Sequence, residues 1–234
     1  MSETLGKHIP LTRIQKLISQ RMLASKHTQP CFYMTAKADV SKIAELRRSI
    51  SKQLGVRISM NDFFIRAMAV SVEKFPLMAG IFKEDYIEIA ETVNIGLAVA
   101  APKGLVVPVI KNANSKSLAD IAKETTELIE KARNNKLSLD ELTGACLTLT
   151  ALGMFGIDSF LAIPSPGQCS ILSVGKIIEE IVLQDGKPSV IKTIEFGLSA
   201  DHRIVTPDYA AEFLTEIISL VSNPEQLTGQ LTAD

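Results

Sequence analysis

The sequence predicts an α/β (α+β) two-layer sandwich, in which helices pack against a mixed β-sheet. Apolar residues recur at helical spacing over the first third of the chain, and at strand spacing from Ile81 onward, with helices at intervals. No repeat, low-complexity tract or break in composition divides the 234 residues. We therefore expect one domain at 10–227 between polar tails at 1–9 and 228–234.

Three helices are expected near the N-terminus. Thr12 is placed to cap the first, which ends at Gln29-Pro30. Ser41 is expected to cap the second, which stops at Gly55, a residue suited to a helix end. The third, at 61–75, is apolar on nearly every side, so we expect it to be buried on several faces.

Strands and two further helices follow from the changes in period. A helix with one polar face is expected at 118–136, and a last helix at 207–221, with Thr206 as its cap and Pro207 as its first residue. Alternating or continuous apolar runs predict extended segments at 31–40, within 81–110, and at 145–152, 169–174 and 190–199.

Composition excludes several classes of protein. The 25 basic and 26 acidic residues give a net charge of −1, which argues against nucleic-acid binding and against an electrostatic membrane anchor. No apolar run approaches the length of a membrane span, and no signal peptide is recognisable. The three cysteines lie far apart without metal-ligand spacing, so neither a disulfide framework nor a metal site is expected. The expected location is the cytoplasm, or an organelle matrix in a eukaryote.

His202 is the candidate catalytic base. It lies in the stretch Asp201-His202-Arg203, where an apolar strand meets the start of a helix. Such a junction holds a side chain rigidly and leaves its tip free. A histidine satisfied by local hydrogen bonds is the alternative interpretation. The other two histidines lie in a polar tail and at a helix end.

Thr148 and Thr150 alternate on a predicted strand that runs into Leu152-Gly153-Met154-Phe155-Gly156. One hydroxyl could donate to an oxyanion; alternatively, the threonines only favour the strand and the glycines a tight turn. The glycines match no nucleotide-binding motif. Asn61-Asp62, at the start of the third helix, is explained by capping alone. The residues by themselves thus indicate an α/β domain with one candidate base.

Six ordered blocks resemble the catalytic core of the dihydrolipoamide acyltransferases, the acyl-transferring subunits of 2-oxoacid dehydrogenase complexes. This family shares its fold with chloramphenicol acetyltransferase. The match runs from about Pro10 to Leu227. The blocks are Ile9-Pro10-Leu11-Thr12, Asn61-Asp62-Phe63, Gly96-Leu97-Ala98-Val99-Ala100, Gly104-Leu105-Val106-Val107-Pro108-Val109, Leu152-Gly153-Met154-Phe155-Gly156 and Ser199-Ala200-Asp201-His202-Arg203.

The resemblance implies a homotrimer with active sites between subunits, where coenzyme A and dihydrolipoamide meet from opposite ends of a channel. It implies that His202 deprotonates a substrate thiol and that Thr150 donates a hydrogen bond to the oxyanion. Supporting roles fall to Asp201 and Arg203. Predicted substrate contacts, also within matching blocks, are Asn61, Asp62, Gly153, Met154 and Phe155.

The chain departs from the family at a supporting ion pair. The family's Asp-Gly beyond the Asp-His-Arg block is replaced by Thr206-Pro207, and the arginine thought to pair with that aspartate is replaced by Gln15. Because both partners have changed, we interpret the change as a compensated replacement. Ala79 replaces a frequent asparagine, which weakens an expected substrate contact.

Assembly and lipoyl supply are also predicted from departures. The polar C-terminal residues replace the leucine-rich end that joins family trimers, so we expect a trimer that does not assemble further. The chain carries no lipoyl domain, so the lipoyl group is expected on another domain or chain. The sequence does not determine the acyl group.

Two other functions remain open at this stage. The first is a non-catalytic trimeric core of a 2-oxoacid dehydrogenase-type complex, for which calorimetry with coenzyme A discriminates. The second is an acetyltransferase of the chloramphenicol type, whose aromatic-rich pattern the chain follows less closely.

Overall fold

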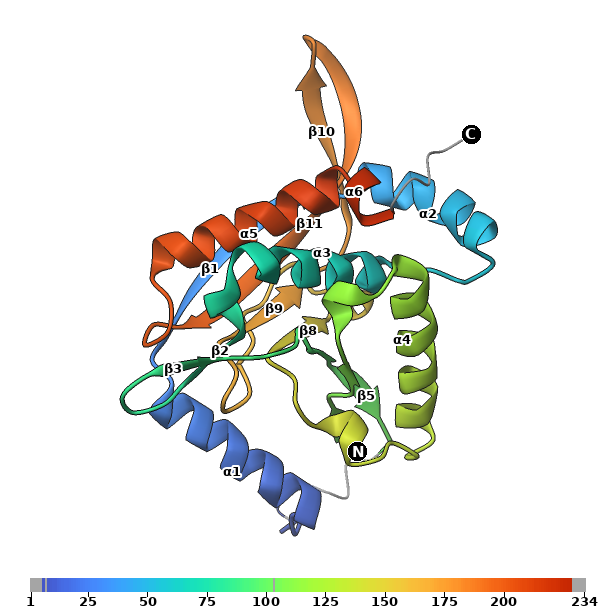
Figure 1. The fold of residues 1–234 in the computed structure, drawn as a ribbon. Coiled ribbons are helices and arrows are strands. Elements are labelled where there is room, and N and C mark those ends of the chain that lie inside the picture. Colours follow the sequence, from blue (N-terminus) through green and yellow to red (C-terminus); the bar gives the residue numbers. More distant parts are fainter. Residues whose placement is uncertain (1–5, 7, 103, 229–234) are drawn as a thin grey trace.

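The central feature is a mixed seven-stranded sheet, seen in a computed structural model that describes residues 6, 8–102 and 104–228 (Figure 1). Strand β8 is parallel to β4 and β9, and the other neighbours are antiparallel, which confirms the predicted mixed sheet. The path of six strands is β1 (Cys31–Asp39), β11 (Lys187–Asp201), β9 (Ser170–Val174), β8 (Leu147–Ala151), β4 (Ile95–Leu97) and β7 (Val109–Ile110). β10 (Ile178–Gln184) pairs with the first half of β11.

Helices cover one face of this sheet, and a helix lies apart from it at the N-terminal end (Figure 1). The covering helices pack on one another, and α5 packs on β1. Their bounds are α2 (Ser41–Leu54), α3 (Met60–Lys74), α4 (Leu118–Arg133), α5 (Pro207–Ser222) and the short α6 (Glu225–Thr228). The separate helix is α1 (Arg13–Thr28). Two small hairpins complete the fold: β2 (Gly80–Phe82) with β3 (Ile87–Ile89), and β5 (Val99–Ala101) with β6 (Gly104–Val106).

The core lies between the helices and the sheet. Helix α3 is at its centre, as its apolar composition predicts, and Phe64 packs edge to face on Phe196 of β11. On β8, Leu147 and Leu149 join this core. Because side chains alternate along a strand, Thr148 and Thr150 face the other side of the sheet.

The other side is covered by the chain segment 157–168. Ser173 of β9 donates to the carbonyl of Phe160, and Ser199 of β11 donates to the carbonyl of Ala162 at 2.7 Å. Hydroxyls on the sheet therefore hold a loop in place of a second helical layer.

The helix caps differ in outcome. Thr12 forms the predicted cap, completed by Gln15. Ser41 was wrong as a cap, because Val40 occupies that position and the Ser41 hydroxyl accepts from the Lys192 backbone N–H instead. Helix α3 begins one residue earlier than predicted, with Ser59 as its cap.

The strand prediction missed β10. It forms a hairpin with β11 through Asp185 and Gly186, both at positive φ as in the common two-residue hairpin turns. The hairpin projects from the body (Figure 1), and Ile181, Leu183 and Val190 on it are 62–78 % exposed. Because neither face of the β10 strand is buried, its sequence does not show the alternation of core-facing apolar residues that predicts a strand. As a result, β11 starts at Lys187 and not at 190.

The chain ends are only partly described. Of the predicted tail at 1–9, residues 6, 8 and 9 are described, and all three are exposed. Thr228, predicted to begin the C-terminal tail, is instead buried as the last residue of α6. Residues 229–234 lie outside the described part.

Candidate active site

His202 lies in a tight turn between β11 and α5. Asp201, the last residue of β11, is fully buried and accepts from both the side chain and the backbone N–H of Arg203. The guanidinium approaches the carboxylate to 2.6 Å, and its other side lies 4.3 Å from the ring centre of Phe82. Asp201 and Arg203 therefore fix the turn, and the His202 side chain points from it into an exposed position.

The start of β1 holds His202 from its other side. The His202 backbone N–H donates to the carbonyl of Pro30 at 3.1 Å. The imidazole packs edge to face against Phe32, with 5.2 Å between ring centres. His202 thus has a fixed backbone and an exposed ring, an arrangement that suits a proton acceptor.

Cys31 lies beside this turn, which the sequence did not predict. It pairs with Asp201 in the β1–β11 register. Burial, followed by the nearby Asp201 carboxylate, raises the pKa of the Cys31 thiol to about 11. At neutral pH this thiol is protonated and does not compete as a nucleophile.

Thr150 lies near the end of β8 and is partly exposed. The chain then enters the short 3₁₀ helix η4 (Gly153–Phe155). Met154 and Phe155 are 73 % and 69 % exposed. A Cβ at Gly153 would lie 2.5 Å from the Gly175 carbonyl oxygen, so only glycine allows this close approach. The predicted contact residues 153–155 therefore lie in an exposed turn directly after the strand that carries Thr150.

Thr150 and His202 are far apart within one chain. Thr150 pairs with Ser173 of β9, and Ser173 pairs with Gly197 of β11. Two strand spacings separate them by roughly 10 Å across the sheet, and the four residues from Gly197 to Asp201 add roughly 13 Å along it. One reacting atom cannot lie within about 3 Å of both side chains in a single protomer.

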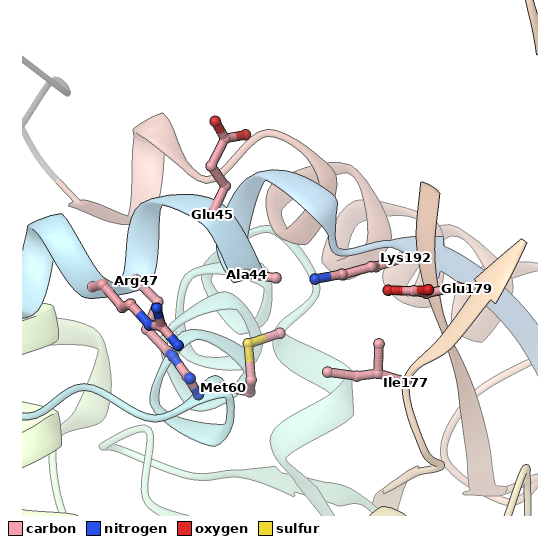
Figure 2. A pocket seen from close by; sticks show the side chains of 8 residues that line it. Ala44, Glu45, Arg47, Met60, Ile177, Glu179 and Lys192 are labelled. Atoms are coloured by element: carbon pink, nitrogen blue, oxygen red, sulfur yellow. The ribbon is translucent and has the colours of Figure 1, made fainter. Parts of the chain in front are cut away.

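A basic cavity of about 650 Å³ opens between α2 and the β10–β11 hairpin (Figure 2). Arg47, Arg48 and Lys192 line it together with Glu45 and Glu179. Figure 2 shows Glu179 beside Lys192 and Glu45 directed away from the side where Arg47 lies. A second cavity of about 290 Å³ shares Arg47 and Arg48 and adds Arg57. Among the described residues, no ion pair involves these three guanidinium groups.

This basic cavity lies toward the Thr150 end of the sheet. Ile177, which lines it, is three residues beyond Val174, and Val174 pairs with Ala151. Sequence reasoning treated α2 only as an amphipathic helix. The signal that could have revealed the cavity was the cluster of three arginines within 47–57.

The remaining predicted residues are placed as follows. Asp62 is 2 % exposed; it completes the Ser59 cap and accepts from the Thr125 hydroxyl at 2.6 Å. Burial raises its pKa, against hydrogen bonds that lower it. Asn61 is partly exposed next to Met60, which lines the basic cavity. Ala79 is buried. Substrate contacts at Asn61 and Asp62 stay predictions, and burial does not favour the second.

Thr206 and Gln15 make separate local contacts. Thr206 is at the cap position of α5 and Pro207 begins the helix, as predicted, although the Thr206 side chain makes no capping hydrogen bond. Its hydroxyl bonds to Asp208 and lowers the pKa of that carboxyl. The Gln15 side chain accepts from the Thr12 backbone N–H at 2.9 Å. Within one protomer, each residue is satisfied by a neighbour in sequence.

The described residues contain no group of three metal-ligating side chains. Over the same residues, no helix has the length and apolar run needed to cross a membrane.

The fold, with a hydroxyl on β8 and an exposed imidazole after β11, is of the chloramphenicol acetyltransferase-like class. Chloramphenicol acetyltransferase aligns with a TM-score of 0.53 at 12 % identity over 86 % of this chain and 94 % of that one, which shows the fold alone. The family model for the catalytic domain of 2-oxoacid dehydrogenase acyltransferases matches residues 3–229. The chain therefore belongs to this family.

Three relatives illustrate the membership. The acetyltransferase component of the Rickettsia felis pyruvate dehydrogenase complex is 37 % identical over 92 % of this chain, which spans about half (53 %) of the relative's length. A probable dihydrolipoamide acetyltransferase of Listeria monocytogenes has a TM-score of 0.89 at 34 % identity, covering 98 % of this chain and 99 % of that one. The Azotobacter vinelandii dihydrolipoamide acetyltransferase also reaches 0.89, at 29 % identity over 94 % and 93 %, in a study of a serine, a histidine and an asparagine in catalysis.

Proposed function

We propose that this chain transfers an acyl group between coenzyme A and a dihydrolipoyl group, in active sites formed between protomers of a homotrimer. The observation that carries the proposal is the separation of His202 and Thr150 on opposite ends of one sheet, which leaves each side chain accessible but unable to share a substrate within one chain. A cyclic trimer repeats the contact of one protomer's His202 end with the next protomer's Thr150 end.

His202 acts as the general base. It takes the proton from the attacking thiol, because a free thiol with a pKa of about 8.5 is only slightly ionised at neutral pH. The thiolate attacks the thioester carbonyl carbon, and the carbonyl electrons move to oxygen. The Thr150 hydroxyl of the neighbouring protomer donates to this oxyanion. As the intermediate collapses, the carbon–sulfur bond of the old thioester breaks, and the departing sulfur receives the proton from His202.

The basic cavity binds the phosphates of coenzyme A. Guanidinium groups pair with phosphate oxygens in a bidentate way, and Arg47 and Arg48 are shared by both adjoining cavities. The cavity lies toward the Thr150 end, so the thiol arm of coenzyme A would run from α2 toward that hydroxyl. The dihydrolipoyl group, carried by another domain or chain, approaches from the His202 side.

A trimer without higher assembly is part of the proposal. Sedimentation as a 24-mer or 60-mer would refute it. The location proposed is the cytoplasm or an organelle matrix.

Mixing two inactive variants tests the shared site. His202→Ala and Thr150→Val, each with its own affinity tag, are co-expressed, and doubly tagged trimers are assayed for acyl transfer from acyl-coenzyme A to dihydrolipoamide. A trimer of mixed composition contains one site with both native side chains, so about one third of the wild-type rate is expected in these hybrids. Hybrids as inactive as the parents would refute a site shared between protomers.

A non-catalytic core subunit is the second candidate. The observation in its favour is that Thr206 and Gln15 are each satisfied locally, so the family's supporting ion pair has no counterpart within the chain. Calorimetry with coenzyme A separates the two: a scaffold binds none, whereas the transferase shows binding that weakens when Arg47 is replaced.

A further inference from the structure

A series of buried hydrogen bonds connects β8, the end of the loop segment 157–168 and the C-terminal end of α1. The Thr148 hydroxyl donates to Gln168 Oε1 at 2.7 Å, and Gln168 Nε2 donates to the Ala145 carbonyl at 3.2 Å. Gln29 Nε2 donates to the Gln168 carbonyl at 2.9 Å. Gln29 and Gln168 are each 7 % exposed and Thr148 is 1 % exposed, so each amide is removed from water and uses both of its ends on protein groups.

Each glutamine precedes a residue whose carbonyl holds the His202 turn. Pro30, after Gln29, accepts the His202 backbone N–H at 3.1 Å. Cys169, after Gln168, accepts the Asp201 backbone N–H at 2.9 Å. The two carbonyls come from segments 139 residues apart in sequence. Both segments flank the end of β11, and the Gln29–Gln168 hydrogen bond links them directly to each other beside the turn.

We propose that Gln29 and Gln168 are positioning residues for His202: their buried hydrogen bond sets the spacing of the two carbonyls that orient the imidazole. The inference relies on the proposed function only for the role of His202 as base. Neither side chain contacts His202, so both act through the backbone.

Ser25 supports the arrangement from α1. Its hydroxyl lies 2.8 Å from Gln29 Oε1 and 2.7 Å from the Pro164 carbonyl oxygen. Because the Gln168 carbonyl only accepts hydrogen bonds, Gln29 must present its amide nitrogen there and its oxygen toward Ser25. The acceptor-only Gln168 carbonyl thus determines the orientation of Gln29, and Ser25 lies within hydrogen-bond distance of its oxygen.

Gly96 leaves the space that the arrangement needs. It pairs with Thr148 across β4 and β8. A Cβ at Gly96 would lie 2.8 Å from Thr148 Oγ1, 3.3 Å from Ala145 Cβ and 2.7 Å from a methyl of Val107. Thr148 and Ala145 are the two residues that the Gln168 side chain binds, so a side chain at position 96 would displace them.

The test compares Gln29→Met and Gln168→Met with the exposed control Gln53→Met on α2, in the full chain. Methionine keeps length and burial but removes the amide. We expect kcat for acyl transfer to fall about tenfold to a hundredfold in both variants, because a small displacement of a catalytic group has a large effect on rate. The KM for each substrate should stay within about twofold, because neither residue touches substrate.

A second readout does not depend on activity. The chain has three histidines, so ¹³C-labelled histidine gives three imidazole signals, of which His202→Ala identifies one. We expect the His202 signal to shift or broaden in Gln29→Met and Gln168→Met, while the His8 and His27 signals stay in place. If the wild type transfers no acyl group, the proposed function fails, yet this readout still decides whether the glutamines position His202.

Thr148 provides a milder pair of variants if a glutamine variant does not fold. Thr148→Val removes one hydrogen bond at nearly constant shape, and Thr148→Ser keeps it. A loss of kcat in the valine variant that the serine variant restores supports the proposal. Folded variants with an unchanged His202 signal and unchanged kcat, including variants that only melt at lower temperature, overturn it.

Discussion

The two ends of the sheet that carry the proposed chemistry are built differently. At the His202 end, a buried carboxylate, two backbone carbonyls and an aromatic ring hold one turn. At the Thr150 end, the strand leads to the exposed Met154 and Phe155, and toward a basic cavity with unpaired arginines. The comparison teaches that the chain itself fixes the proposed base, whereas the proposed recognition surfaces at the Thr150 end are exposed and would be completed by a neighbouring protomer and a substrate.

Removing the base should give the largest effect. For His202→Ala we expect kcat/KM to fall by roughly 10²–10⁴-fold, the usual contribution of a positioned general base. His27→Ala, at the exposed end of α1, serves as the control and should retain the wild-type rate. Steady-state transfer from acyl-coenzyme A to dihydrolipoamide measures both. Equal rates for the two variants would remove His202 from the mechanism.

Replacing Thr150, the proposed oxyanion donor, tests the other end of the sheet. Thr150→Val keeps the shape of the side chain and should lower kcat by roughly 10²–10³-fold. Thr150→Ser keeps the hydroxyl and should remain within about tenfold of the wild type. Rapid-mixing measurement of a single turnover separates this effect from product release. A valine variant as fast as the serine variant would show that the hydroxyl is not the donor.

Cys31 tests how closed the His202 end is. Because its folded-state pKa is raised to about 11, the thiol stays protonated at lower pH and the thiolate appears only as pH rises toward that value. At pH 8 we expect alkylation by iodoacetamide to be roughly 10²-fold slower than for a peptide thiol with a pKa of about 8.5. Mass spectrometry follows the rate, and Cys31→Ser identifies the site. A rate that reaches its plateau below pH 9 would contradict the predicted environment.

The arginines test whether the Thr150 end recognises phosphate. For Arg47→Met and Arg48→Met we expect the Kd for coenzyme A to rise about tenfold each, since a charged hydrogen bond contributes about 1.5–3 kcal/mol. Dephospho-coenzyme A should show a smaller loss if the 3′-phosphate is the group bound. Calorimetry measures both ligands, and Arg13→Met on α1 is the control. Unchanged affinities in both cavity variants would exclude this cavity as the phosphate site.

Local signals were enough to predict most of the fold. Thr12 begins α1 and Gly55 ends α2 because capping and left-handed geometry are encoded by neighbouring residues. Ser41 shows the limit: its hydroxyl bonds to Lys192, which no local pattern reveals. The β10 hairpin was missed because its apolar residues are exposed, although Asp185-Gly186 was a turn signal.

The candidate site also contains residues with a local sequence signal and residues without one. His202 could be singled out because an apolar strand meets the start of a helix there, and the Asp201–Arg203 contact in the structure fixes that junction. The basic cavity and the Gln29–Gln168 contact were missed, because they join segments that only the folded sheet brings together. For the cavity, the three arginines within 47–57 were the one local signal. Polar residues in such positions look like ordinary surface residues in a sequence.

Gly96 carries a consequence for how this domain can diverge. The hydroxyl of Thr148 occupies the volume that a methyl group on residue 96 would take. Many side chains around the imidazole could therefore be exchanged, whereas alanine at 96 would displace Thr148 and, through Gln168, disturb the His202 turn. In a deep mutational scan, we therefore expect position 96 to be among those that tolerate substitution least.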